Sequence, residues 1–340
     1  MAHREKEALI VLAAHRSGSS ALTRVCAMLG ADLPRNLLAP APANSKGYWE
    51  SKDLVNLHDE ALKSMGLSWD DPRGAASEWF SSSLAEDFRH RLEETLLRDF
   101  CDSKRFVVKD PRLCRLVPLW IPVLQAISTT PKFVFVIRNP LEVAASLEER
   151  DGIPLAQSLL LWLRHLVEAE SATRPFPRVF VNYEELLEDW RPVLDEISTK
   201  LVLGWPLDSQ TFEAEIGQFL SPSDRHHHIS ASELQARQDI PSWVKRMYGV
   251  VTDKAVGRRE LSDVFDAVGS EIAAADQTFG GILTGLVTDE IKSAKRELLS
   301  TQVRAQELAA RVSDLEHSAS WRLTEPLRTV AGWVPKQGRR

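Results

Sequence analysis

A short polar turn near the start of the chain combines residue types that bind anions. Residues 15–20 read HRSGSS and stand between an apolar run, residues 8–14, and residues 21–29, whose apolar side chains recur at helical spacing. Gly18 permits a sharp turn, and the serine hydroxyls lie beside amides that the start of a helix leaves unpaired. Such a junction binds a phosphate or a sulfonate, and Arg16 adds a permanent, forked positive charge.

This turn differs from the ATP-binding loop of the Walker type. That loop requires GxxxxGK[ST], and no Gly-Lys-Ser/Thr sequence occurs in the chain, so ATP hydrolysis is disfavoured. A purely structural alternative stays open at this point. In it, the turn joins a strand to a helix, its serines cap the helix and Arg16 lies on the surface.

Four short runs rich in β-branched and aromatic residues recur between helical stretches. They are residues 9–13, 106–109, 133–138 and 179–183. This alternation predicts an α/β fold with a central, mostly parallel sheet and helices on both faces. The runs end in the polar sequences HRSGSS, KDPR, RNP and NYEE. Because ligands bind outside the carboxyl ends of parallel strands, we expect one pocket lined by all four.

Composition limits the partners and the location of the chain. Its 340 residues include 42 basic and 48 acidic ones, a net charge of −6, so no general positive field attracts nucleic acid or an anionic membrane. Local arginines must therefore bind any anionic ligand. The charged first residues leave no room for a signal peptide, and no apolar run reaches the roughly 18 residues of a membrane span. Both observations predict a cytoplasmic protein.

The three cysteines are Cys26, Cys101 and Cys114, with no CxxC pair and no histidine at ligand spacing. This pattern predicts neither a disulfide framework nor a zinc site. We expect buried thiols in a reducing compartment.

Taken together, these motifs resemble the sulfotransferases that use 3′-phosphoadenosine 5′-phosphosulfate (PAPS). The similarity covers about residues 8–250 and is closest to the bacterial carbohydrate and tyrosylprotein sulfotransferase-like branch. The matching segments are RSGSS at 16–20, KDPR at 109–112, RNPLEVAAS at 138–146 and VNYEELL at 181–187. The resemblance implies a P-loop-like three-layer sandwich and PAPS as the donor. It implies no metal, because arginine and lysine supply the charge that magnesium supplies in kinases.

The resemblance also implies which residues bind the donor. The 5′-phosphosulfate would lie on the turn and the helix start, against Arg16, Ser17, Gly18, Ser19, Ser20 and Ala21. The 3′-phosphate would contact Arg138 and Ser146, and Tyr183, followed by Glu184, would border the nucleotide. Arg16 and Arg138 would then hold opposite ends of one ligand. The alternatives are an ion-paired surface Arg138, a Ser146 that fills a gap between helix and sheet, and a core Tyr183.

Catalytic roles follow from the same resemblance. Lys109, with Arg16, would stabilise charge on the bridging oxygen as the S–O bond breaks. Glu50, in the sequence GYWE, is the candidate general base, with Asp53 and His58 as alternatives. Glu50 could instead be a carboxylate that favours the start of a helix.

Several other residues have competing interpretations. Asp110 and Arg112 are expected to form an ion pair in the KDPR turn. Asn139, Pro140 and Glu142 are typical of a helix start. Residues 225–228, RHHH, predict a loop near the cofactor or a solvated loop rather than a metal site. Trp69 and Trp79 could stack on a sugar or pack in the core.

The C-terminal part changes character. We expect a sulfotransferase domain at 1–260, a helical and coiled-coil extension at 261–317, and a basic, aromatic tail at 318–340. Apolar residues follow 4,3 spacing at Val287, Ile291, Ala294, Leu298, Thr301, Ala305, Leu308, Val312 and Leu315, with threonine as the exception. Residues 287–315 could therefore form a homo-oligomer or pack back on their own domain.

The tail sequence SASWRLTEPLR is similar to C-terminal sequences of bacterial glycan-modifying enzymes. It suggests a membrane-surface or glycan-assembly partner for the tail. The function expected from these features is sulfuryl transfer from PAPS to a hydroxyl of a small molecule or, more specifically, of a carbohydrate or lipid-linked glycan. The alternatives are a nucleotide-dependent kinase with a degenerate phosphate loop and a non-catalytic nucleotide-binding scaffold.

Overall fold

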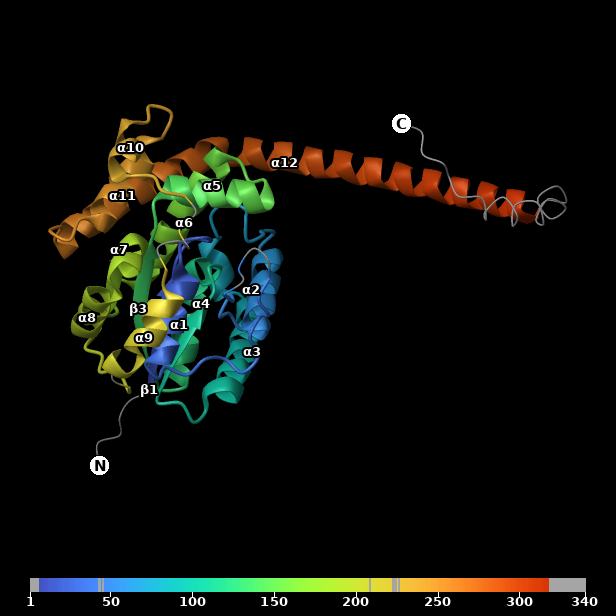
Figure 1. Ribbon diagram of the computed structural model, residues 1–340. Coiled ribbons are helices and arrows are strands. Elements are labelled where there is room, and N and C mark those ends of the chain that lie inside the picture. Colours follow the sequence, from blue (N-terminus) through green and yellow to red (C-terminus); the bar gives the residue numbers. More distant parts are fainter. Residues whose placement is uncertain are drawn as a thin grey trace, which may run out of the picture. The chain divides into compact units, whose positions relative to one another are not determined.

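The computed structural model describes residues 6–41, 44, 46–207, 209–221, 225 and 227–317. The chain divides into two compact units, Met1–Ala274 and Ala275–Arg340. The helices and strands, labelled in Figure 1, are β1 (Lys6–Leu12), α1 (Ser19–Met28), α2 (Lys52–Ser64), α3 (Ser83–Phe100), β2 (Arg105–Lys109), α4 (Leu113–Ala126), β3 (Thr129–Ile137), α5 (Pro140–Asp151), α6 (Leu155–Thr173), β4 (Arg178–Asn182), α7 (Tyr183–Glu188), α8 (Trp190–Leu201), α9 (Glu213–Phe219), α10 (Ala231–Ala236), α11 (Ser242–Thr252) and α12 (Arg258–His317). Two short 3₁₀ helices, Ser77–Ser81 and Ser209–Phe212, complete the set of described helices.

The four described strands form one parallel sheet in the order β2-β1-β3-β4. All four predicted strands are present, although β3 begins at Thr129, earlier than expected. This extension includes Pro131, which lacks the N–H group that a strand residue donates. Pro131 lies opposite Ala8 of β1, whereas pairing with β4 begins only at Phe133, so one edge of β3 is open there and tolerates a proline.

Side chains alternate along the strands and fill a core on each face of the sheet. In β1, Ala8, Ile10 and Leu12 belong to one core and Leu9 and Val11 to the other. Helices α2 to α6 and α11 contribute to the first core, and α1, α7, α8 and α9 to the second (Figure 1). The expected three-layer α/β sandwich is therefore confirmed.

Helix α5 begins as the sequence predicts. The side chain of Asn139 accepts a hydrogen bond from the Leu141 amide at 3.0 Å, and Pro140 occupies the first turn. Gly152, at φ 69°, ends the helix in the left-handed conformation. The cap fixes α5 directly after β3, so that residues at four-residue intervals along α5 share one face.

Helix α12 belongs to both units. Phe265, Val268 and Ile272 are buried in the core of the first unit. Among the apolar positions of the 4,3 pattern, Leu308 and Val312 have described side chains that are 57% and 53% exposed. Val287, Ile291, Ala294, Leu298 and Leu315 have side chains outside the described set, and the tail at 318–340 lies outside it altogether.

No helix in the described ranges is both long enough and apolar enough to span a membrane. Cys26 and Cys114 are buried, but Cys101 is exposed, so the expectation of three buried thiols is wrong. Cys101 directly follows α3, where the chain leaves the helix for an exposed turn.

Candidate active site

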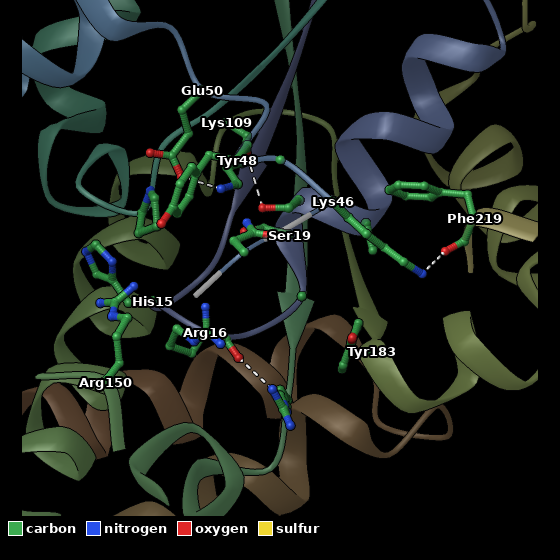
Figure 2. A pocket seen from close by; sticks show the side chains of 17 residues that line it. His15, Arg16, Ser19, Lys46, Tyr48, Glu50, Lys109, Arg150, Tyr183 and Phe219 are labelled. Carbon is green, nitrogen blue, oxygen red and sulfur yellow. Dashed lines mark hydrogen bonds and ion pairs between the residues drawn. The ribbon is translucent and has the colours of Figure 1, made fainter. Parts of the chain in front are cut away.

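A cavity of about 210 Å³ opens where β1 and β2 end and α1 begins (Figure 2). The predicted site residues that line it are Arg16, Gly18, Ser19, Ser20, Ala21, Glu50, Lys109, Arg138 and Tyr183. Ser17 and Ser146, also predicted, are buried next to the cavity wall. The expected gathering of polar strand ends in one pocket is thus observed for β1, β2, β3 and β4.

The first turn of α1 presents its amides without a side-chain cap among the described residues. Gly18, at φ 85°, precedes the helix in the left-handed conformation, and no described side chain caps the helix. The serines therefore do not act as the caps that one interpretation suggested. Ser20 Oγ instead donates to the carbonyl of Tyr48 at 3.1 Å, and Ser17 Oγ is buried with no hydrogen-bond partner in the described part of the chain. Uncapped amides at a helix start favour an anion.

Arg16 lies against the same wall of the cavity as Arg138. Its Nε donates to Ser146 Oγ at 2.8 Å, and its carbonyl accepts from Arg138 Nη1 at 3.0 Å. The Arg138 guanidinium therefore contacts the backbone of Arg16, while the Arg16 guanidinium reaches Ser146. Burial, followed by the guanidinium groups of Arg150 and Arg138, lowers the pKa of Arg16 from its ordinary value. A desolvated cation crowded by like charges gains free energy when an anion binds beside it.

Arg138 is oriented by Glu142 and by an aromatic ring. Its Nε donates to Glu142 Oε2 at 2.8 Å, and its guanidinium lies 5.3 Å from the centroid of Tyr183. Glu142 also accepts from Arg225 Nε and from the Ile229 amide, at 3.0 and 2.9 Å. Arg225 therefore contacts Glu142, the partner of Arg138, and does not line the cavity. His226 lies outside the described residues.

Glu50 and Lys109 form a buried ion pair inside the cavity (Figure 2). Their side chains are 8% and 4% exposed. Burial raises the pKa of Glu50 above its ordinary value, and Lys109 partly opposes this rise. A carboxylate with a raised pKa is a stronger proton acceptor than an exposed carboxylate. Glu50 also contacts Lys109, the cation expected at the bridging oxygen.

The two alternative bases lie elsewhere. His58 is fully buried; its Nδ1 is 2.8 Å from Asp110 Oδ2, and its Nε2 accepts from Trp120 Nε1 at 2.9 Å. Because the indole nitrogen only donates, the His58 proton is on Nδ1 and both ring nitrogens are engaged. Asp53 is paired with Arg98 at 2.7 Å on the surface. Neither side chain lines the cavity.

The KDPR turn has the expected ion pair. Arg112 Nη1 is 3.0 Å from Asp110 Oδ1, and Arg112 also pairs with Asp59 at 2.5 Å. Burial opposes ionisation of Asp110, but Arg112 and His58 hold its pKa below the ordinary value. The turn is therefore held from two sides, which directs Lys109, the preceding residue, into the cavity.

Sequence reasoning missed several residues that line the cavity: His15, Lys46, Tyr48, Arg150 and Phe219. Of these, only Arg150 could have been found from the sequence. It follows Glu142 and Ser146 at four-residue intervals, so the three residues share one face of a helix. Lys46 donates to the Phe219 carbonyl at 2.7 Å, a contact between residues that are far apart in the sequence.

The two tryptophans considered for sugar stacking differ. Trp79 packs against Phe80 and Phe88, whereas Trp69 contacts His15 beside the cavity. The described residues hold no group of three His, Cys, Asp or Glu side chains that could bind a metal ion.

No protein-family model and no curated protein matches this chain. Among solved structures, it is similar to a sulfotransferase domain from the curacin biosynthetic pathway, with 13% identity and a TM-score of 0.38 over 79% of this chain and 98% of that one. It is also similar to a sulfotransferase domain from the Synechococcus PCC 7002 olefin synthase, with 17% identity and a TM-score of 0.36 over 79% of this chain and 97% of that one. At these identities and TM-scores, we argue function from the residues of the site.

Proposed function

We propose that this protein transfers the sulfuryl group of PAPS to a hydroxyl group, most specifically on a carbohydrate or lipid-linked glycan. The observation that carries the proposal is the composition of the cavity. Arg16, Lys109 and Arg138 line it beside the uncapped amides of α1, and Glu50 is buried in contact with Lys109. Such a set binds an anionic donor and supplies a proton acceptor in the same space.

The residues fit a donor with separated anionic groups. The amides that follow Gly18, together with Arg16, would bind the phosphosulfate. Arg138, held by Glu142 and lying over the Tyr183 ring, would bind the 3′-phosphate. The resemblance of RSGSS, KDPR and RNPLEVAAS to sulfotransferase motifs supports PAPS over other nucleotides.

In the proposed reaction, Lys109 acts on the leaving oxygen and Glu50 acts on the acceptor hydroxyl. The Lys109 ammonium would donate to the bridging oxygen as it gains negative charge. Glu50 would take the proton of the acceptor hydroxyl, which attacks the sulfur in line with the departing oxygen. Because burial raises the pKa of Glu50, the proton transfer is more favourable than to an exposed carboxylate.

A thermal-shift comparison of adenosine 3′,5′-bisphosphate (PAP), ATP with magnesium, NAD and S-adenosylmethionine tests the donor class without knowledge of the acceptor. We expect PAP to raise the melting temperature most, since a ligand at a hundred times its Kd stabilises by about 2.7 kcal/mol. Arg138→Ala should weaken PAP binding in calorimetry because a charge-assisted phosphate contact is lost. A preference for ATP with magnesium would support the kinase alternative.

PAP binding without turnover of PAPS on any glycan would support the scaffold alternative. Further expectations from the sequence stay proposals: the domain limits at 260 and 317, a homo-oligomer through residues 287–315, a membrane-surface or glycan-assembly partner for residues 318–340, and a cytoplasmic location.

A further inference from the structure

The segment that carries Glu50 contains two residues in the left-handed backbone conformation. Gly47 has φ 96° and Trp49 has φ 56°. Glycine adopts this conformation without strain, whereas a bulky side chain brings its β-carbon too close to the backbone. A strained residue of this kind persists only where its surroundings hold it in place. Trp49 directly precedes Glu50, so its backbone sets the direction from which the Glu50 side chain starts.

Contacts of the Trp49 ring supply this restraint. The Arg24 guanidinium lies 4.7 Å from the ring centroid, which is a cation–π contact. The ring also packs on Gly47, where an added β-carbon would stand 3.4 Å from both Trp49 Cε2 and Nε1. Trp49 Nε1 is buried and has no hydrogen-bond partner in the described part of the chain. Stacking and packing, rather than a hydrogen bond of the indole, therefore hold the residue in its strained conformation.

Helix α1, whose first turn would bind the donor, contacts both residues that precede Glu50. Ser20 Oγ donates to the Tyr48 carbonyl at 3.1 Å, and Arg24, four residues later, stacks on Trp49. Residues four apart share one face of a helix. One face of α1 therefore holds residues 48–49 in place.

The chain is also fixed from Glu50 onward. The Glu50 carbonyl accepts a hydrogen bond from the Leu38 amide at 2.8 Å. Ser51 Oγ caps α2 by accepting from the Leu54 amide at 3.3 Å. Main-chain bonds and a cap thus set the path after Glu50, whereas a side-chain ring sets the path before it.

Trp49 itself lies outside the cavity. Tyr48 and Glu50, its two neighbours in the sequence, line the cavity, and Trp49 does not. The Glu50 side chain is 8% exposed and contacts Lys109 inside the cavity (Figure 2). Trp49 can therefore influence the reaction only through its neighbours.

We propose that Trp49, with Arg24, is a positioning residue for Glu50. The inference rests on the proposed function. The ring keeps the backbone left-handed, and this conformation directs the Glu50 carboxylate toward Lys109 and the acceptor hydroxyl. The acceptor oxygen then forms its bond to sulfur, while the bond between sulfur and the bridging oxygen breaks. PAP leaves with that electron pair, and the acceptor proton passes to Glu50.

A double-mutant cycle in melting temperature tests the positioning without any acceptor. In the wild type, the effects of Glu50→Gln and Lys109→Met should be non-additive, because the two side chains form a buried ion pair. In Trp49→Ala, we expect this non-additivity to fall to less than about half, since the carboxylate leaves its partner. Trp49→Phe keeps a ring on which Arg24 can stack. It should retain most of the non-additivity, and it guards against a folding defect.

Arg24→Gln should reduce the non-additivity in the same direction, because the cation–π contact is lost. The matched control is Arg191→Gln. The Arg191 guanidinium also lies 4.7 Å from a tryptophan centroid, that of Trp190, and neither residue lines the cavity. We expect this control to leave the cycle unchanged.

Turnover of PAPS with 4-nitrophenyl glucoside as the acceptor tests whether the positioning serves the reaction. Trp49→Ala should lower kcat at least about tenfold, because small displacements of a reacting group are costly, while PAP affinity in calorimetry stays within about twofold. In a Glu50→Gln background, Trp49→Ala should change the residual turnover by less than about twofold. A general loss of structure would lower that turnover again.

An unchanged cycle in Trp49→Ala, a normal kcat in that variant, or PAP affinity that weakens as much as kcat would each overturn the proposal. The same holds if Trp49→Ala lowers the residual turnover of Glu50→Gln by its full factor. A wild type that binds no PAP would instead overturn the proposed function, and the cycle would still show whether Trp49 positions Glu50.

Discussion

The ring of Tyr183 lies directly against the backbone of Gly18. A β-carbon at residue 18 would stand 2.1 Å from Tyr183 Cδ2, and the backbone there has φ 85°. The first residue of α7, directly after β4, therefore closes one side of the turn that begins α1. Only a residue without a side chain fits, so the amides of the turn and the aromatic wall of the cavity are positioned together.

Replacing Gly18 should damage both folding and donor binding. Gly18→Ala combines a steric clash with a left-handed backbone, which alone costs about 1–2 kcal/mol. We expect a lower melting temperature and at least about tenfold weaker PAP binding. Gly249→Ala in α11, where an added β-carbon meets nothing within 4 Å, is the control and should be tolerated. Normal PAP affinity in Gly18→Ala would remove this turn from the donor site.

Glu50→Gln should separate binding from chemistry. The amide oxygen can still accept from Lys109, so the cavity keeps its shape and PAP affinity should change by less than about twofold. Turnover should fall by roughly two orders of magnitude or more, as loss of a general base does. Steady-state rates and PAP calorimetry on the same preparation measure both. Full turnover in this variant would show that another group accepts the proton.

Lys109→Met should depress turnover more than PAP affinity, because the ammonium acts on charge that develops in the transition state. The variant also leaves Glu50 buried without its cation, so the melting temperature should fall. The double variant Glu50→Gln/Lys109→Met should recover part of that stability. The opposite ranking, with affinity reduced more than turnover, would assign Lys109 to ground-state binding of the donor.

The acid limb of the pH–rate profile should follow Glu50. A base acts only when deprotonated, so turnover should fall as the pH drops through the pKa of Glu50. Burial raises that pKa above 4.5, and Lys109 is the group that most lowers it again. We therefore expect the limb above pH 4.5 in the wild type and at a still higher pH in Lys109→Met. A limb that does not move in Lys109→Met would contradict the pairing.

Folding stability should also depend on pH through His165. Its Nδ1 donates to the Leu161 carbonyl at 2.7 Å, and burial, followed by Arg115, lowers its pKa from 6.5 to about 4. Between these values the unfolded chain binds a proton that the folded chain does not. The free energy of unfolding should therefore decrease as the pH drops through this window, by up to about 1.4 kcal/mol per pH unit. Urea unfolding measures this free energy at each pH from about 7 to 4.5. Plotted against pH, it should change less steeply for His165→Gln than for the wild type. Equal pH dependence in the two proteins would count against His165 as the origin.

Local patterns predicted the parts of the fold that short segments determine. The apolar runs gave the strands, and Asn139 with Pro140 gave the start of α5, because capping and periodicity act within a few residues. The ion pair between Asp110 and Arg112 is equally local. The polar strand ends could be assigned to one edge since parallel topology requires it.

Contacts between distant segments could not be predicted in this way. Nothing in the sequence indicates that Glu50 pairs with Lys109, or that Arg16 donates to Ser146, since helix packing sets these approaches. The same holds for His58, whose enclosure by Asp110 and Trp120 removes it from the cavity. Burial and partner identity, rather than residue type, decide which candidate group can react.

The bonds from Arg115 and Arg164 to the segment after Trp69 have a consequence for how the sequence of that segment could vary. Arg115 and Arg164 grip main-chain carbonyls, not side chains, of the segment at Asp71 and Pro72. Neighbouring side chains can therefore be exchanged without loosening the support. Substitutions in this segment alone could therefore change what its side chains bind, while its backbone keeps its position.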